Sequence, residues 1–200
     1  MQHAGICHRD MSLENLLVHR NGCLVIDFGM CLRIPYHAPE LSGEHEADKR
    51  LNDTMNRMSL TRQNGDTASI LQCKRVLLRP QGTCGKWIYM SPEVYNNKDA
   101  FDGFAVDMWA AGVILFLMLT GFPPWERACA TDDRFKYMTA GYLVQMLTEW
   151  KIGLSSDAMD LLQRMLWLDP KDRLSLAQVK AHPWMANAGK AAMPSSNPVF

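Results

Sequence analysis

The 200-residue sequence lacks an excess of charge of either sign, and its start lacks an export signal. Its 21 Lys and Arg residues balance 21 Asp and Glu residues. Without a basic excess, neither a nucleic acid nor an acidic membrane surface is an expected partner. Residues 1–5 have no basic start and lead into no apolar run, so they do not form a secretory signal.

The sequence also lacks the cysteine and histidine patterns of disulfide-rich and zinc-binding proteins. Its six cysteines include no C-x-x-C pair, and its six histidines include no H-x-x-x-H pair. Cysteines scattered in this way indicate reduced thiols. We therefore expect an intracellular, cytoplasmic protein without structural zinc.

No apolar run is both long and free of charge. Residues 104–122 are apolar over a length near the minimum of roughly 17 residues for a membrane span. Asp107 lies inside this run, and a carboxylate is costly in lipid. We therefore expect a helix over residues 105–119 that is buried on all sides in a globular protein, and no membrane partner.

What the sequence does contain is a group of polar residues near its start, in the stretch H-R-D-M-S-L-E-N followed by D-F-G. Residues 16–18 and 23–27 between and around these motifs are apolar and partly β-branched, which favours paired strands. Asn21-Gly22 between them predicts a tight turn. We expect the hairpin to bring Asp27 close to Asn15. Their carboxylate and amide oxygens are donors of the kind that hold Mg²⁺. Asp10, before the first strand, is then free to meet a substrate hydroxyl.

These motifs resemble the H-R-D-L-x-x-x-N and D-F-G signatures of protein kinases, with Met11 in the Leu position. Further kinase-like stretches follow in order: S-P-E at 91–93, D-M-W-A-A-G at 107–112, and D-P-K-D-R-L-S around Arg173. The resemblance extends over about residues 3–186. It implies a Ser/Thr kinase that transfers the γ-phosphate of ATP to a protein substrate, with Mg²⁺ as cofactor.

The resemblance also implies a role for each matching residue. Asp10 corresponds to the catalytic base, Asn15 and Asp27 to the metal ligands, and Leu17 to the floor of the adenine pocket. Three implied roles are structural: packing of His8 and Phe28 beside Gly29, a buried ion pair of Glu93 with Arg173, and backbone anchoring by Asp107. One implied role is regulatory. Arg9 pairs with a phosphate that an upstream kinase adds, and Thr83 is the best candidate for the phosphorylated residue.

Two positions depart from the family pattern. Ser12 occupies the position in which most Ser/Thr kinases carry Lys, and Lys86 occupies the Thr position of a C-G-T-P segment. The resemblance implies that the two positions lie side by side near the γ-phosphate. We interpret this as an exchange in which the Lys86 ammonium acts in catalysis. The alternative is a pseudokinase-like, non-catalytic interaction module.

The expected fold is mainly α: the helical large lobe of the protein kinase fold, with a small β-hairpin at the active cleft. The expected domain covers residues 1–186, with a polar insertion at about 33–81 whose end, 70–78, regains strand character, and a flexible tail at 187–200. Further helices are predicted over 134–149, 155–167 and 175–181. The 200 residues contain no Gly-rich phosphate loop and no small lobe, so we expect this chain alone to be inactive.

Overall fold

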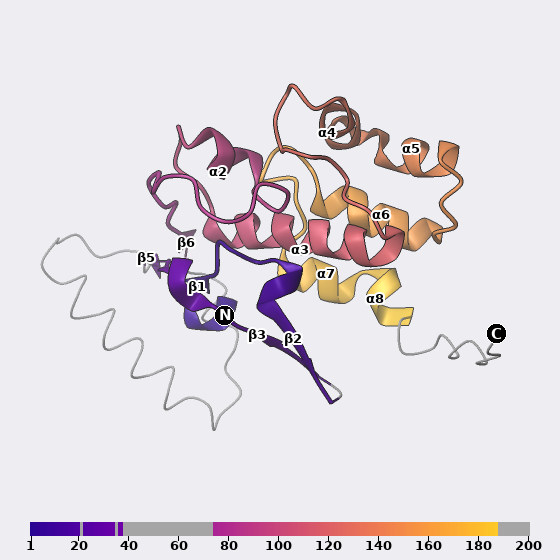
Figure 1. Ribbon diagram of the computed structural model, residues 1–200. Coiled ribbons are helices and arrows are strands. Elements are labelled where there is room, and N and C mark those ends of the chain that lie inside the picture. Colours follow the sequence, from indigo (N-terminus) through magenta and orange to yellow (C-terminus); the bar gives the residue numbers. More distant parts are fainter. Residues whose placement is uncertain (21, 35, 38–73, 188–200) are drawn as a thin grey trace, which may run out of the picture.

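The computed structural model describes residues 1–20, 22–34, 36–37 and 74–187. A body of helices fills one side of the molecule, and short N-terminal strands lie along it (Figure 1). The hairpin of β2 and β3 extends away from the helical body. This is the mainly helical arrangement with small N-terminal strands that the sequence predicts.

The predicted hairpin is present, but its second strand begins one residue earlier than predicted. Strand β2, Leu16–His19, pairs antiparallel with β3, Gly22–Val25. Gly22, which was predicted in the turn, pairs with His19 and so belongs to the second strand, and Arg20 after the first strand has a positive φ of 50°. Residue 21 lies outside the described part of the chain. Ile26 and Asp27 do not belong to the strand, because the backbone turns at Asp27 (φ 61°) into the short 3₁₀ helix η3, Phe28–Met30.

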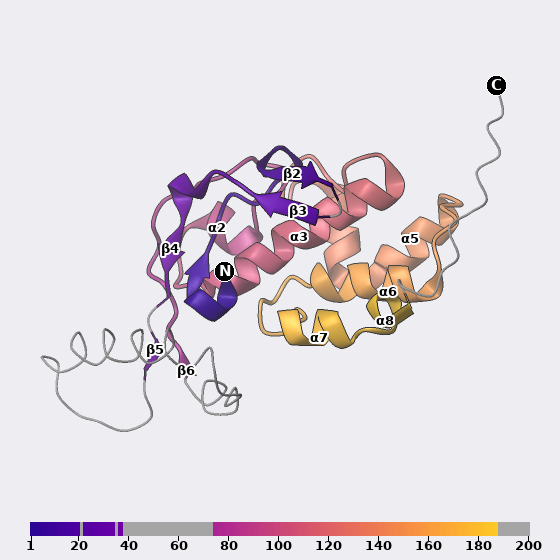
Figure 2. The ribbon, with the colours of Figure 1, turned by 90° about the horizontal axis from the view of Figure 1, so that it is seen from below.

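Two further pairings of two-residue strands were not expected, although one of these strands, at residues 74–75, lies inside the stretch 70–78 that was predicted to have strand character. Strand β1, Ile6–Cys7, follows the 3₁₀ helix η1, Gln2–Ala4, and pairs with β4, Leu32–Arg33. Strand β5, Tyr36–His37, pairs with β6, Lys74–Arg75, so the two ends of the insertion meet (Figure 2). After β6, Leu78 bridges to Phe101. Most of the predicted insertion, and residues 70–73 of its expected strand, lie outside the described residues.

The helical body is centred on α3, Gly103–Thr120, which follows the short helix α2, Pro92–Asn96. The Asp102 side chain caps α3 by accepting from Phe104 N, which places its start two residues before the predicted one. By length and composition α3 could span a membrane, but just over half of it is buried in the protein. Met118 is 67% exposed, so α3 is not buried on all sides. Trp109 and Trp125 stack at 5.0 Å in the main core.

The single helix predicted over 134–149 is wrong, because this stretch contains a break. Helix α4, Asp133–Tyr137, leads into a π-helical turn, η6, Met138–Tyr142, before α5, Leu143–Glu149. Gly141 has φ 98°, which only glycine adopts readily, and this residue ends the regular helical path. As a result Leu143 is fully buried, whereas Tyr142, which the helical spacing placed on the apolar face, is 49% exposed.

The C-terminal helices pack along α3 on the side away from β2 and β3 (Figure 2). Helix α6, Ser156–Met165, begins with the predicted cap, since Ser155 Oγ accepts from Ala158 N, but it ends two residues earlier than predicted. Helix α7, Leu176–Ala181, starts with a capping box from Ser175. A further helix that the sequence did not reveal, α8, Pro183–Asn187, begins after the buried His182, whose ring bonds to Asp160 at 2.9 Å. The predicted tail lies beyond the described residues, apart from 187.

Candidate active site

The loop that carries Asp10 is anchored to the core helix by one carboxylate. Asp107, on α3, accepts from the backbone N–H of His8 at 2.7 Å and of Arg9 at 2.8 Å. These bonds hold Arg9 at a positive φ of 67°, a conformation that costs a non-glycine residue free energy. Burial raises the pKa of the Asp107 carboxyl, and the two N–H donors act against that rise. Asp107 therefore has the anchoring contacts that the resemblance implies.

His8 connects this loop to the chain segment that leads into Asp27. Its ring is completely buried, and Nδ1 accepts from the backbone N–H of Asp10 at 3.3 Å. Because Nδ1 acts as the acceptor, the proton lies on Nε2, which donates to Ile26 O at 3.0 Å. The imidazole thus links the backbone of Asp10 to the residue just before Asp27.

Asn15 forms the second connection between the same two segments. It lies in the 3₁₀ helix η2, Leu13–Asn15, and is only 8% exposed. Its amide Nδ2 donates to Asp10 O at 2.8 Å and to Asp10 Oδ2 at 3.4 Å, and its backbone O accepts from Ile26 N at 3.0 Å. Hydrogen bonds therefore link Asp10 and Asn15 to each other and to Ile26, the residue just before Asp27.

Asp27 is the most open of these three residues. Its side chain is exposed, and Oδ1 accepts only from Gly29 N, at 3.3 Å. Mg²⁺ in nucleotide sites takes one or two protein oxygen ligands and completes its shell with phosphate and water. An exposed carboxylate, on a segment whose backbone is bonded to that of Asn15, fits that requirement. Among the described residues there is no cluster of three or more His, Cys, Asp or Glu side chains that would form a metal cage independent of a substrate.

Lys86 lies against the Asp10 loop, next to Ser12. Lys86 Nζ donates to Ser12 Oγ at 3.4 Å and pairs with Glu14 at 3.0 Å. Glu14 was missed by the sequence reasoning, which gave it no partner. Its pKa is lowered first by its own backbone N–H and then by Lys86. The preceding Gly85 has φ 87°, and a Cβ there would come within 3.1 Å of Asp10 Oδ1, so the backbone covers the carboxylate closely.

The ion pair between Glu93 and Arg173 is present and well buried. Arg173 donates Nη1 to Glu93 Oε1 at 2.6 Å and Nη2 to Oε2 at 2.8 Å, in bidentate geometry. Three backbone carbonyls accept its remaining N–H groups, namely those of Trp167, Ala105 and Leu168. This pair joins α2 to the segment after α6, and it has a structural role.

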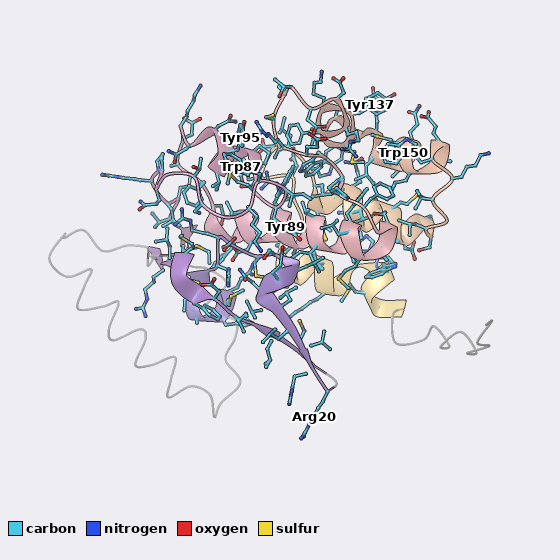
Figure 3. The ribbon with its side chains drawn as sticks, viewed as in Figure 1. Arg20, Trp87, Tyr89, Tyr95, Tyr137 and Trp150 are labelled. Atoms are coloured by element: carbon cyan, nitrogen blue, oxygen red, sulfur yellow. The ribbon has the colours of Figure 1, made fainter. Side chains whose placement is uncertain are left out.

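The remaining predicted residues occupy less constrained positions. Phe28 contacts His8 at 5.2 Å but is 50% exposed, so it is not a core residue. Leu17 is 48% exposed on the hairpin, whose tip is marked by Arg20 in Figure 3. Arg9 donates weakly to Met30 O at 3.4 Å, and Thr83 is exposed.

A carboxylate on an anchored loop, close to amide and carboxylate oxygens and a lysine, on a mainly helical lobe, is typical of the class of kinase-like phosphotransferases. Residues 1–38, which contain Asp10, Asn15 and Asp27, match the family model "Phosphotransferase enzyme family". Residues 66–185, which contain Lys86, Glu93, Asp107 and Arg173, match "Protein kinase domain". The chain therefore belongs to the protein kinase family.

Relatives of this chain are Ser/Thr protein kinases. The human serine/threonine-protein kinase DCLK3 is 32% identical over 197 residues, which is 95% of this chain and 23% of that protein. CBL-interacting protein kinase 10 from Oryza sativa subsp. japonica is 29% identical over 90% of this chain and 30% of its own length. Serine/threonine-protein kinase CHK1 from Mycosarcoma maydis is 28% identical over 92% of this chain and 22% of its own length. The chain thus spans less than a third of each of these relatives.

Proposed function

We propose that the protein transfers the γ-phosphate of Mg–ATP to a Ser or Thr hydroxyl of a protein substrate. The observation that carries this proposal is the hydrogen-bonded framework that connects Asp10, Asn15 and the turn into Asp27. Phosphoryl transfer depends mainly on positioning and on charge neutralisation, and rigid backbone links of this kind supply positioning.

Each residue has a defined task in this proposal. Asp10 orients the acceptor hydroxyl and takes its proton, while Asn15 holds the Asp10 carboxylate through Oδ2. Asn15 and Asp27 would also hold Mg²⁺, which neutralises charge on the phosphates when it is bound. The Lys86 ammonium bonds to Ser12, which follows Asp10 by two residues, and so lies next to the Asp10 loop. Leu17 contributes an exposed apolar side chain for the adenine.

The proposal includes a further segment that carries the Gly-rich loop and its lysine, which the 200 residues do not contain. The hairpin supports this, because Leu17 and Leu24 pair across the two strands on one face, and they are 48% and 54% exposed. Burying such a surface stabilises a fold by about 25 cal/mol per Å². We propose that a second lobe covers this face in the active protein.

A kinase assay with point variants tests the proposal. In a longer protein that includes the second lobe, Asp10→Asn and Asp27→Asn are expected to lower kcat by at least about 100-fold. Asp99→Asn, at an exposed position with no role in this proposal, is the matched control and leaves kcat unchanged. Phosphorylation of a protein substrate that persists in both site variants would refute the assignment.

The non-catalytic alternative rests on one observation. The Lys86 ammonium is closer to Glu14 than to Ser12, so part of its charge is already neutralised. If the protein is a pseudokinase-like interaction module, the longer protein binds partners but shows no turnover with any peptide library. Measurable turnover that is lost in Asp10→Asn excludes this alternative.

A further inference from the structure

A small cavity lies behind Asp10, between the catalytic loop and the helical body. Its volume is about 10 Å³, which is at the lower end of the roughly 10–15 Å³ that one buried water needs. Residues of three segments line it, among them Arg9, Asp10, Cys84, Tyr89, Ser91 and Val106. Tyr89 is labelled in Figure 3, where it lies beside α3.

Buried polar atoms without a partner are concentrated around this cavity. In the described part of the chain, four buried side-chain polar atoms have no hydrogen-bond partner within the protein, and three belong to lining residues. These three atoms are Arg9 Nε, Asp10 Oδ1 and Ser91 Oγ. A buried polar group without a partner costs about 1–3 kcal/mol, so three such groups at one cavity require an explanation.

Ser91 is the clearest of the three unpartnered groups, because it stands at a helix N-cap but its hydroxyl does not cap the helix. It is completely buried and stands at the N-cap of α2, where serine hydroxyls commonly accept from the helix N–H groups. Here its hydroxyl makes no such capping bond. The hydroxyl is therefore available to a group inside the cavity.

We infer that a single ordered water occupies this cavity and bridges Ser91 Oγ to Asp10 Oδ1. A water suits the mixture of groups, because it donates to the carboxylate and accepts from the serine hydroxyl and from Arg9 Nε–H. A metal cation would be repelled by the arginine N–H, and an anion would be repelled by the Asp10 carboxylate. The apolar lining residue Val106 leaves little room for a larger polar ligand.

The water gives Ser91 a role as a positioning residue for the proposed catalytic base, a role that depends on the proposed function. Asn15 bonds to Asp10 Oδ2, and the water bonds to Oδ1, so both carboxylate oxygens are fixed. Gly85 also lies close to Oδ1, since a Cβ at this position would come within 3.1 Å of it. Ser91 thus acts on the orientation of Asp10 without touching the substrate.

Crystal structures of the 200-residue chain that resolve ordered water test the site without any activity measurement. The wild type is expected to show one water within hydrogen-bond distance of Ser91 Oγ and Asp10 Oδ1. Ser91→Ala should lose this water and rotate the Asp10 carboxylate. Ser91→Gly should keep the orientation, because a second water can replace the hydroxyl, and glycine is tolerated at an N-cap. An empty cavity, a Ser91 hydroxyl that caps α2, or an unchanged Asp10 in Ser91→Ala overturns the inference.

Kinetics of the longer protein test the positioning role. Ser91→Ala is expected to lower kcat roughly five- to tenfold with the KM for ATP unchanged, and Ser91→Gly to restore most of it. Thr139→Val is the matched control, since it removes another buried hydroxyl, which bonds to Phe135 O at 2.7 Å outside this cavity. If Thr139→Val lowers kcat as much as Ser91→Ala, the positioning role is wrong. If the wild type has no turnover, the proposed function fails, while the water site is still decided by the crystal structures.

Discussion

The buried ion pair between Glu93 and Arg173 gives a stability prediction that needs no catalytic assay. The Arg173 side chain is 1% exposed and that of Glu93 is 14% exposed. Glu93→Gln removes the only carboxylate that pairs with this guanidinium within the described residues. The backbone carbonyls that remain accept hydrogen bonds but carry no net charge, so a buried cation is left without its counter-ion.

The expected cost is about 3 kcal/mol, at the lower end of the range for breaking a buried pair, because glutamine retains one acceptor. With a denaturant slope of about 2–3 kcal/mol per M, the urea midpoint of the 200-residue chain should fall by about 1–1.5 M. The matched control is Asp133→Asn, which removes an exposed pair with Lys136 of the same 2.6 Å length. It should cost less than about 1 kcal/mol. If the two variants lose equal stability, burial does not govern the Glu93 pair and our reasoning is wrong.

Three further predictions follow from single residues. In the longer protein, Lys86→Ala should lower kcat more than about threefold if its ammonium replaces the lysine absent at Ser12, and the double variant Ser12→Lys/Lys86→Thr should recover it; a smaller loss disproves the exchange. Gly141→Ala should destabilise the chain by about 1–2 kcal/mol or more, because its φ is 98° and a Cβ would come within 3.1 Å of Trp167, whereas Gly153→Ala meets open space and should not. The Thr131 hydroxyl lowers the pKa of the Cys129 thiol, whereas burial raises the pKa of Cys7 to about 11. Iodoacetamide at about pH 8.5 should therefore alkylate Cys129 before Cys7. Peptide mass spectrometry that finds Cys7 modified first would contradict this.

The Cys7 shift also sets a direction for stability against pH. Its folded-state pKa lies above the unfolded value, so the thiol form favours folding. This contribution is complete below the unfolded pKa, near 9, and is lost as pH rises toward about 11. Cys7→Ser should flatten the alkaline fall in stability, which thermal unfolding over this pH range can measure.

Local sequence signals predicted the parts of the fold that depend on neighbours in the chain. The β2–β3 hairpin, the cap of α6 at Ser155 and the end of α3 before the two prolines all follow from residues within a few positions. The break at Gly141 did not, because one glycine in a helical pattern is compatible with a continuous helix. The broken helix is stabilised by Gln163, which is distant in sequence and whose side chain accepts from Leu143 N and donates to Met138 O across the break.

In the candidate site, too, local signals pointed to some residues, whereas contacts between distant segments could not be predicted. The residue types and their order predicted Asp10, Asn15 and Asp27, and the contacts of Asp107 and Arg173 followed from the resemblance. The cavity behind Asp10 could not be predicted, because it depends on Ser91, which is 81 positions away from Asp10 in the sequence. The partner of Lys86 was also missed, since no local rule pairs it with Glu14.

The central claim is that Asp10, Asn15 and Asp27 form one site for a metal–nucleotide complex. The most direct measurement is paramagnetic broadening of amide NMR signals by Mn²⁺–ATP in the longer, isotope-labelled protein. We predict that the signals of all three residues broaden together at the same Mn²⁺–ATP concentration, that Ala181 on α7 is unaffected, and that Asp27→Asn abolishes the effect. Broadening of only one of the three, or of Ala181 to the same extent, would contradict the account.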